Sequence, residues 1–171
     1  VGLMLIKWYQ TYKEWKKKRG IKDRAAAGAL VLALGLVTAW EGYEGKVYLD
    51  PVGIPTVCYG HVVPSNVKVG THFSTEACHE ILYADLKVAS EAVDRYVRVE
   101  IPDYTKAALI SFVFNVGIGN FKKSRLLKLI NQGDIVAACH ELPKWVYAKG
   151  KKLKGLVNRR QAEMRLCLGY T

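Results

Sequence analysis

Three carboxylates stand close together in a chain that is otherwise basic. Glu41, Glu44 and Asp50 fall within the stretch TAWEGYEGKVYLDPVGIPTVCYGH, residues 38–61. Glu41 follows an uncharged apolar run, whereas Asp50 lies among turn and strand formers. A carboxylic acid beside apolar packing keeps its proton more readily than a solvated one. Two carboxylates in unlike surroundings are what cleavage of a glycosidic bond requires, one as a proton donor and one ionised.

The same residues have simpler structural interpretations. Glu41 could be a surface residue at a helix end, and Asp50 an ordinary turn former. Thr56 adds a hydroxyl able to hold a water molecule between the two carboxylates. Spacing alone therefore leaves catalytic and structural roles both open.

Length and composition limit the classes of protein. The chain has 171 residues, half of them apolar, which suits one domain of ordinary size and excludes global disorder. Its formal net charge of +11 favours anionic partners: nucleic acid, phospholipid head groups or an anionic polymer such as a cell wall.

The chain divides into three zones. Residues 1–24 form a basic arm with eight Lys or Arg, two acidic residues and interspersed Trp and Tyr, which suits a membrane interface or a solvated tail. Residues 25–40 carry no charge. As a helix they would span about 24 Å, which is short of a hydrocarbon core of ~30 Å. This segment is a buried core helix, a signal-type segment or a marginal membrane span. Residues 41–171 form the folded body.

The folded body has an α+β pattern. Strand formers broken by Pro and Gly predict a small sheet within residues 46–62. Ser74 is a candidate N-cap for a helix with apolar residues at 78, 82, 86, 89 and 93. Further helices are predicted for residues 104–116, 124–132, 134–142 and 156–168, and the segment VGIGNF at 116–121 is predicted to be a turn.

Four cysteines occur, Cys58, Cys78, Cys139 and Cys167, without a CxxC motif or a tight Cys/His cluster. The sequence therefore predicts no metal site. Two disulfides and four buried thiols both remain open, and export of the chain would favour the disulfides.

An ordered set of motifs favours a catalytic role for these carboxylates over a structural one. Glu41-Gly42, Tyr48 and Asp50 are followed by Thr56 and Gly60-His61, which gives E-G-x5-Y-x-D, five residues, then T-x3-G-H. This pattern resembles the catalytic signature of the phage-type lysozymes, glycoside hydrolase family 24. Further matches follow in order: SFVFNVGIGNF at 111–121, Ser124-Arg-Leu-Leu, Asn131-Gln-Gly-Asp134, Trp145 and Asn158-Arg159-Arg160. The resemblance covers about residues 38–170.

The resemblance implies a fold and a reaction. The fold has a small β-containing lobe joined by a long helix, about residues 75–98, to a helical lobe, with a cleft between them. Glu41 would be the general acid, Asp50 would place or activate water and stabilise positive charge, and Thr56 would orient that water. The reaction implied is inverting hydrolysis of the bond between N-acetylmuramic acid and N-acetylglucosamine in peptidoglycan.

The resemblance also implies roles for other residues. Asn115 and Arg159 fall where the family lines its cleft, so they are candidates for sugar or peptide contacts; a helix cap and a surface ion pair are the alternatives. His61 is expected as a structural ion-pair partner near the site, and Glu44 does not fit the pattern. Placed on this fold, Cys58 would pair with Cys78, and Cys139 with Cys167. We expect a monomer without cofactor, metal or nucleic acid.

The N-terminus departs from typical family members and is similar to that of the signal-anchor-release endolysins. In that group a weakly hydrophobic segment exports the enzyme and tethers it, inactive, to the inner membrane until it is released into the periplasm. Residues 25–40 fit this pattern, whereas the role of residues 1–24 stays open. Two other functions compete: a cationic, membrane-active lytic module without catalysis, and a catalytically inactive wall-binding protein.

Overall fold

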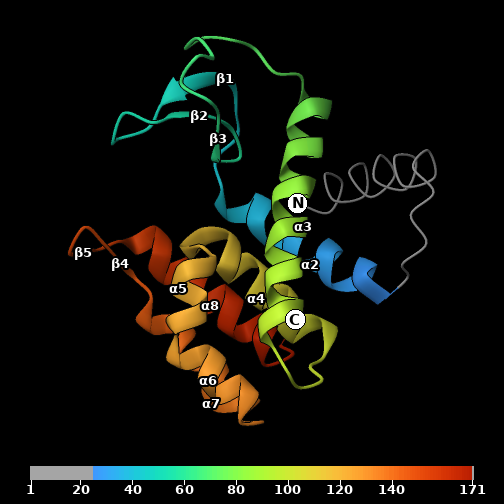
Figure 1. Cartoon of the computed structure of the whole chain (residues 1–171). Coiled ribbons are helices and arrows are strands. Elements are labelled where there is room, and N and C mark those ends of the chain that lie inside the picture. The colour runs from blue at the N-terminus through green and yellow to red at the C-terminus, as the bar shows by residue number, and fades with distance from the viewer. Residues whose placement is uncertain (1–24, 171) are drawn as a thin grey trace.

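The computed structural model describes residues 25–170, so the predicted basic arm of residues 1–24 lies outside the described part. A small sheet forms one lobe, and α3 (Thr75–Tyr96) runs from it into a lobe of helices (Figure 1). The other elements are α2 (Ala25–Trp40), β1 (Glu44–Leu49), β2 (Pro55–Cys58), β3 (His61–Val62), α4 (Asp103–Val116), α5 (Ile118–Lys123), α6 (Arg125–Asn131), α7 (Ile135–Cys139), η1 (Leu142–Lys144), β4 (Tyr147–Ala148), β5 (Lys151–Lys152) and α8 (Lys154–Cys167). The predicted α+β architecture with two lobes is confirmed.

The small lobe is an antiparallel sheet with strand order β1-β2-β3. Tyr48 pairs with Thr56, and an irregularity in β1 lies between Glu44 and Tyr48. Val47 and Val57 are buried beneath the sheet. Because three short strands make a small core, this lobe depends on its attachment to α3.

Helix α3 begins where the sequence predicts. The Ser74 hydroxyl accepts a hydrogen bond from the backbone N–H of Ala77 at 3.1 Å, as an N-cap does. The apolar residues at helical spacing are buried along one face. The helix ends at Tyr96, close to the end near residue 98 that the resemblance implied. Its buried face joins the cores of both lobes.

Helix α4 is the centre of the helical lobe. Its residues 107–113 are all buried, and α2, α3 and α8 pack around it. A helix that is buried on all sides can be apolar all round, which explains its lack of a polar face.

Helix α2 lies in this core. Ala29, Ala33 and Val37 are fully buried at helical spacing and form the stripe that faces its neighbours. Gly28 allows a close approach, because a β-carbon there would lie 2.7 Å from a carboxylate oxygen of Asp103 at the start of α4. Within residues 25–170, no helix combines the length and the apolarity that a membrane crossing requires.

Two disulfides bridge the elements. Cys58 on β2 is bonded to Cys78 on α3, and Cys139 on α7 to Cys167 on α8. These are the pairs that the resemblance implied. The first bond fixes the sheet to the long helix α3. The second joins α7 to α8, the last two α-helices of the helical lobe.

The structure differs from the sequence prediction at two places. The predicted turn at 116–121 is wrong beyond Gly117, because residues 118–123 form α5. The two-stranded sheet β4–β5 was not predicted, since its strands have two residues each and lack the alternation that identifies longer strands.

Candidate active site

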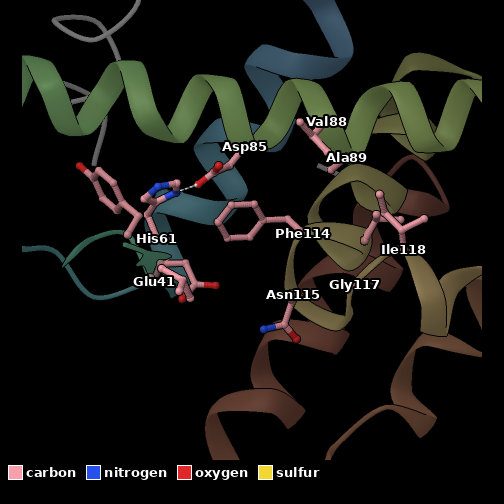
Figure 2. Close-up of a pocket in the computed structure, with 13 residues that line it drawn as sticks. Glu41, His61, Asp85, Val88, Ala89, Phe114, Asn115, Gly117 and Ile118 are labelled. Atoms are coloured by element: carbon pink, nitrogen blue, oxygen red, sulfur yellow. Dashed lines mark hydrogen bonds and ion pairs between the residues drawn. The ribbon is translucent and has the colours of Figure 1, made fainter. Parts of the chain in front are cut away.

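A cavity of about 480 Å³ opens where the small lobe meets α3 and the end of α4. Glu41 and His61 contribute to one side, Val88 and Ala89 of α3 to another, and Asn115 to a third (Figure 2). Its lining therefore comes from both lobes, as expected for a cleft that binds an extended molecule.

Glu41 is presented to this cavity by the end of α2. Its backbone N–H donates to the carbonyl of Val37 at 2.8 Å, so the residue still belongs to the last helical turn. Its side chain is 23% exposed, and Oε1 accepts a hydrogen bond from Nη1 of Arg159. Oε2 faces Gly60, where a β-carbon would lie 3.9 Å away. One carboxylate oxygen is thus held by a cation while the other faces the β2–β3 turn.

Arg159 lies behind Glu41 and does not line the cavity. Its side chain is 4% exposed, its Nε donates to Glu163 at 3.0 Å, and its Nη2 donates to the carbonyl of Ser111 at 3.2 Å. The guanidinium is therefore shielded from a sugar in the cleft. Its observed contacts are to Glu41, Glu163 and Ser111, whereas the substrate contact expected from the resemblance stays a prediction.

The network continues through Arg160, which is fully buried. It is paired with Glu163, donates to the Asn115 side-chain oxygen, and lies over the Phe112 ring at 5.1 Å. Burial lowers the pKa of Arg160 from its ordinary value, while the charge of Glu163 acts in the opposite direction. Glu163 is wholly buried between two arginines, which fixes both guanidinium groups.

Asn115 lies at the end of α4 and lines the cavity, as its predicted substrate-binding role requires. Because its oxygen accepts from Arg160, its amide NH₂ is the group available to donate to a ligand. The orientation of this amide is set by a buried cation, so the donor is held in place before any ligand arrives.

His61 and Asp85 form an ion pair at the edge of the cavity. Nδ1 of His61 lies 2.8 Å from Oδ2 of Asp85, and both side chains are about one-third exposed (Figure 2). The pair joins β3 to α3, which is the structural position expected for His61. When the imidazole is protonated, both members of the pair carry a charge.

Asp50 and Thr56 lie in the β1–β2 hairpin and are not among the cavity-lining residues. Oδ1 of Asp50 accepts from the backbone N–H groups of Val52 and Ile54, both at 2.9 Å. The Thr56 hydroxyl donates to the carbonyl of Ile54 at 3.0 Å, and the residue is 4% exposed. The turn thus fixes one carboxylate oxygen of Asp50 and leaves Oδ2 for a water molecule.

Glu44 lies apart from the cavity on an exposed stretch of β1. Its carboxylate accepts from the backbone N–H of Lys46 at 3.1 Å. This local contact agrees with its exclusion from the motif and makes it a useful comparison for Glu41.

Sequence reasoning missed the residues behind the acid. Glu163 and Asp85 lie outside the quoted motifs, and Ser111 begins SFVFNVGIGNF but was given no role. A signal existed at Arg159, Arg160 and Glu163, because spacings of three and four residues place both arginines beside the same carboxylate on a helix. Across the described chain, no three His, Cys, Asp or Glu side chains converge as a metal site would require.

Comparisons with known proteins agree on one family. The family model for phage lysozyme matches residues 38–163. The chain is 43% identical to the SAR-endolysin of Bacteriophage PS119 over 88% of its own length and 93% of that protein. It is 39% identical to the SAR-endolysin of Enterobacteria phage PA-2, over 88% and 94%. The solved endolysin of Escherichia coli O157:H7 phage FAHEc1 superposes with a TM-score of 0.73 at 31% identity, over 82% of this chain and 92% of that one.

Proposed function

The chain belongs to the phage lysozyme family, and we propose that it hydrolyses the β-1,4 linkage between N-acetylmuramic acid and N-acetylglucosamine in bacterial peptidoglycan. The consequence is lysis of the host cell at phage release. The observation that carries this proposal is the Glu41 carboxylate, which lines the cavity with one oxygen held by the buried Arg159.

Glu41 would act as the general acid. The transferable proton belongs on Oε2, because Oε1 accepts from Arg159. As this proton passes to the glycosidic oxygen, the bond to the sugar carbon breaks and Glu41 becomes a carboxylate. The adjacent guanidinium stabilises that new negative charge without having to move, which lowers the barrier for the step.

Asp50 and Thr56 would supply the water. With Oδ1 fixed by two backbone N–H groups, Oδ2 of Asp50 can accept a hydrogen bond from the attacking water and oppose the positive charge on the sugar carbon. The Thr56 hydroxyl, which donates to Ile54, retains lone pairs for the same water. The water oxygen then bonds to the sugar carbon from the opposite face, and its proton passes to Oδ2 of Asp50, which completes an inverting reaction.

The proposal extends to where the enzyme works. Residues 25–40 would export the chain and tether it to the inner membrane, from which it is released into the periplasm. The same apolar residues cannot face lipid and also pack on α4. Release would let Ala29, Ala33 and Val37 enter the core and bring Glu41 to the cavity. Membrane attachment and catalysis would thus exclude one another.

A single substitution with a matched control tests the activity. Purified Glu41→Gln and Glu44→Gln each lose one carboxylate from the same stretch, and both keep the cationic arm. Release of reducing ends from isolated peptidoglycan and clearing of outer-membrane-permeabilised cells are measured for both. We expect Glu41→Gln to fail in both assays and Glu44→Gln to match the wild type.

The rival functions give different results in these assays. A non-catalytic lytic module would let Glu41→Gln clear cells at the wild-type rate, and a chain lacking residues 1–24 would then lose that activity. A wall-binding protein without catalysis would release no reducing ends even as the wild type. Either result would overturn the proposal.

A further inference from the structure

A cationic hairpin projects from the helical lobe, and the proposed reaction makes no use of it. Residues 147–155, YAKGKKLKG, are all exposed, and we name them the lysine hairpin. They contain Lys149, Lys151, Lys152 and Lys154, and no acidic residue occurs between 142 and 162. Within the described residues, none of the four lysines forms an ion pair. Four unneutralised cations therefore lie together on one short element.

The turn of this hairpin carries a lysine where the backbone disfavours it. Lys149 and Gly150 both have positive φ, 49° and 76°, as in the type I′ turns that join short strands. Gly, Asn or Asp normally fills the first of these positions. Apart from Cys58, Lys149 is the only non-glycine residue with positive φ in the described chain. A charged side chain at a strained tip, with no partner in the fold, points to a partner outside it.

The base of the lysine hairpin is fixed to the wall of the cleft. Val146 is buried and accepts a hydrogen bond from Leu153 at 3.0 Å. The carbonyl of Trp145 accepts from Nε of Arg160 at 3.2 Å, and the same guanidinium binds Asn115 in the cavity. At about 3.4 Å per residue, the tip extends roughly 10–14 Å beyond Trp145. The lysine hairpin and the β1–β2 turn that carries Asp50 project to the same side of the molecule (Figure 1).

A second cationic region is built differently. A hollow of about 720 Å³ is lined by Arg98, Lys122, Lys123, Arg125 and Lys128. Two of these already have partners in the fold: Lys122 lies over the Tyr96 ring at 5.1 Å, and Arg125 lies 3.7 Å from Glu141. This region has five cations, and within the described residues no hydrogen bond or ion pair joins it to Arg160, so four of its residues supply a control of equal charge.

We propose that the lysine hairpin is a docking element for the carboxylates of the peptidoglycan strand that occupies the cleft. The inference rests on the proposed function, because it concerns the same substrate. Peptidoglycan bears short peptides with free carboxylates along its glycan, and lysines bind such groups as mobile point charges. Tyr147 is 64% exposed and pairs across the strands with Lys152, which places an aromatic and a cationic side chain on the same face of the hairpin for contact with sugar and carboxylate.

This element would set affinity and leave the chemical step unchanged. None of the four lysines is among the described residues that line the cavity, and the tip of the hairpin extends roughly 10–14 Å beyond Trp145, so they act away from the reacting bond. Each exposed ion pair contributes modestly, roughly two- to fivefold, and several together give about tenfold. Because the contacts are exposed, added salt should weaken them.

Two quadruple variants test the proposal. The hairpin variant carries Lys149→Gln, Lys151→Gln, Lys152→Gln and Lys154→Gln. The control variant carries Lys122→Gln, Lys123→Gln, Arg125→Gln and Lys128→Gln, and loses the same charge. KM and kcat are measured on isolated peptidoglycan and on the same material with its carboxylates amidated. We expect the hairpin variant to raise KM about tenfold on native peptidoglycan with kcat unchanged, and the control to change KM less than twofold. On amidated peptidoglycan, the wild type and hairpin variant should converge.

Other outcomes overturn the proposal. Equal losses in the two variants would show a general effect of net charge. A KM that rises equally on amidated peptidoglycan would show a carboxylate-independent role. Loss of binding to vesicles of anionic phospholipid, with wall kinetics unchanged, would assign the lysine hairpin to a membrane. The proposed function itself fails separately, if Glu41→Gln retains activity on either substrate.

Discussion

Glu41 and Asp50 are nine residues apart in the chain, yet the structure holds them in opposite ways. Glu41 is fixed by Arg159 from α8, which is itself fixed by buried groups on α4 and α8. Asp50 is fixed by backbone N–H groups two and four residues further along the chain. The proposed acid, Glu41, depends on the packing of the whole helical lobe, whereas Asp50, proposed to bind the water, depends on one local turn. Substitutions in the helical core should therefore change the position of the Glu41 side chain and leave the geometry around Asp50 intact.

The largest effect is expected at the acid itself. Glu41→Gln removes the transferable proton while an amide oxygen can still accept from Arg159. General acid catalysis contributes about 10²–10⁴-fold, so we expect kcat to fall by about 10³-fold or more. Reducing-end release measures this loss, and thermal unfolding should show the fold unchanged. A variant with kcat within tenfold of the wild type would remove Glu41 from the chemical step.

Glu163→Gln tests whether the acid depends on the helical core. It leaves Arg160 with a neutral partner in place of its carboxylate and Arg159 with Glu41 as its one carboxylate among the described residues, and breaking a buried ion pair destabilises by about 3–5 kcal/mol. We expect a lower free energy of unfolding in urea and lower activity in the same variant, because Arg159 loses its support. A stable variant with full activity would contradict the dependence of Glu41 on this network.

Asp50→Asn should separate activity from stability. The asparagine side-chain oxygen can still accept from Val52 and Ile54, so the turn is kept. The negative charge that faces the water is lost, and we expect kcat to fall by about 10²-fold. The free energy of unfolding should stay within about 0.5 kcal/mol of the wild type, as for a surface change. Loss of stability together with activity would show that Asp50 is not held locally.

The smallest effect is expected at His61. His61→Asn removes the ion pair with Asp85, whose side chains are about one-third exposed, and such pairs contribute about 1 kcal/mol or less. The Cys58–Cys78 disulfide still fixes the small lobe to α3 in this variant. We expect a slightly lower melting temperature and activity within a few fold of the wild type. A kcat loss as large as that of Glu41→Gln would make His61 catalytic.

The sequence predicted those features that depend on near neighbours or on spacing along one element. The N-cap at Ser74, the buried stripe of α3 and the two-lobed α+β fold followed from local patterns or from the ordered motifs, and the structure has them. The turn chemistry at Asp50 is equally local. By contrast, residues 118–123 became α5 although Gly119 lies within them and Gly117 directly before them, because Phe121 is buried in the core and tertiary packing outweighs propensity.

Only the tertiary structure decided the role of Arg159. In the sequence it is 118 residues from Glu41 and reads equally well as a cleft residue or a surface cation. The fold buries it behind the acid because α2, α4 and α8 pack together, and a buried guanidinium must find partners for its charge. Likewise, the sequence determined that residues 25–40 are apolar. Such a segment is compatible with either a lipid bilayer or the core of the protein. The contacts of Ala29, Ala33 and Val37 are what place this helix in the core, since apolarity alone does not specify a partner.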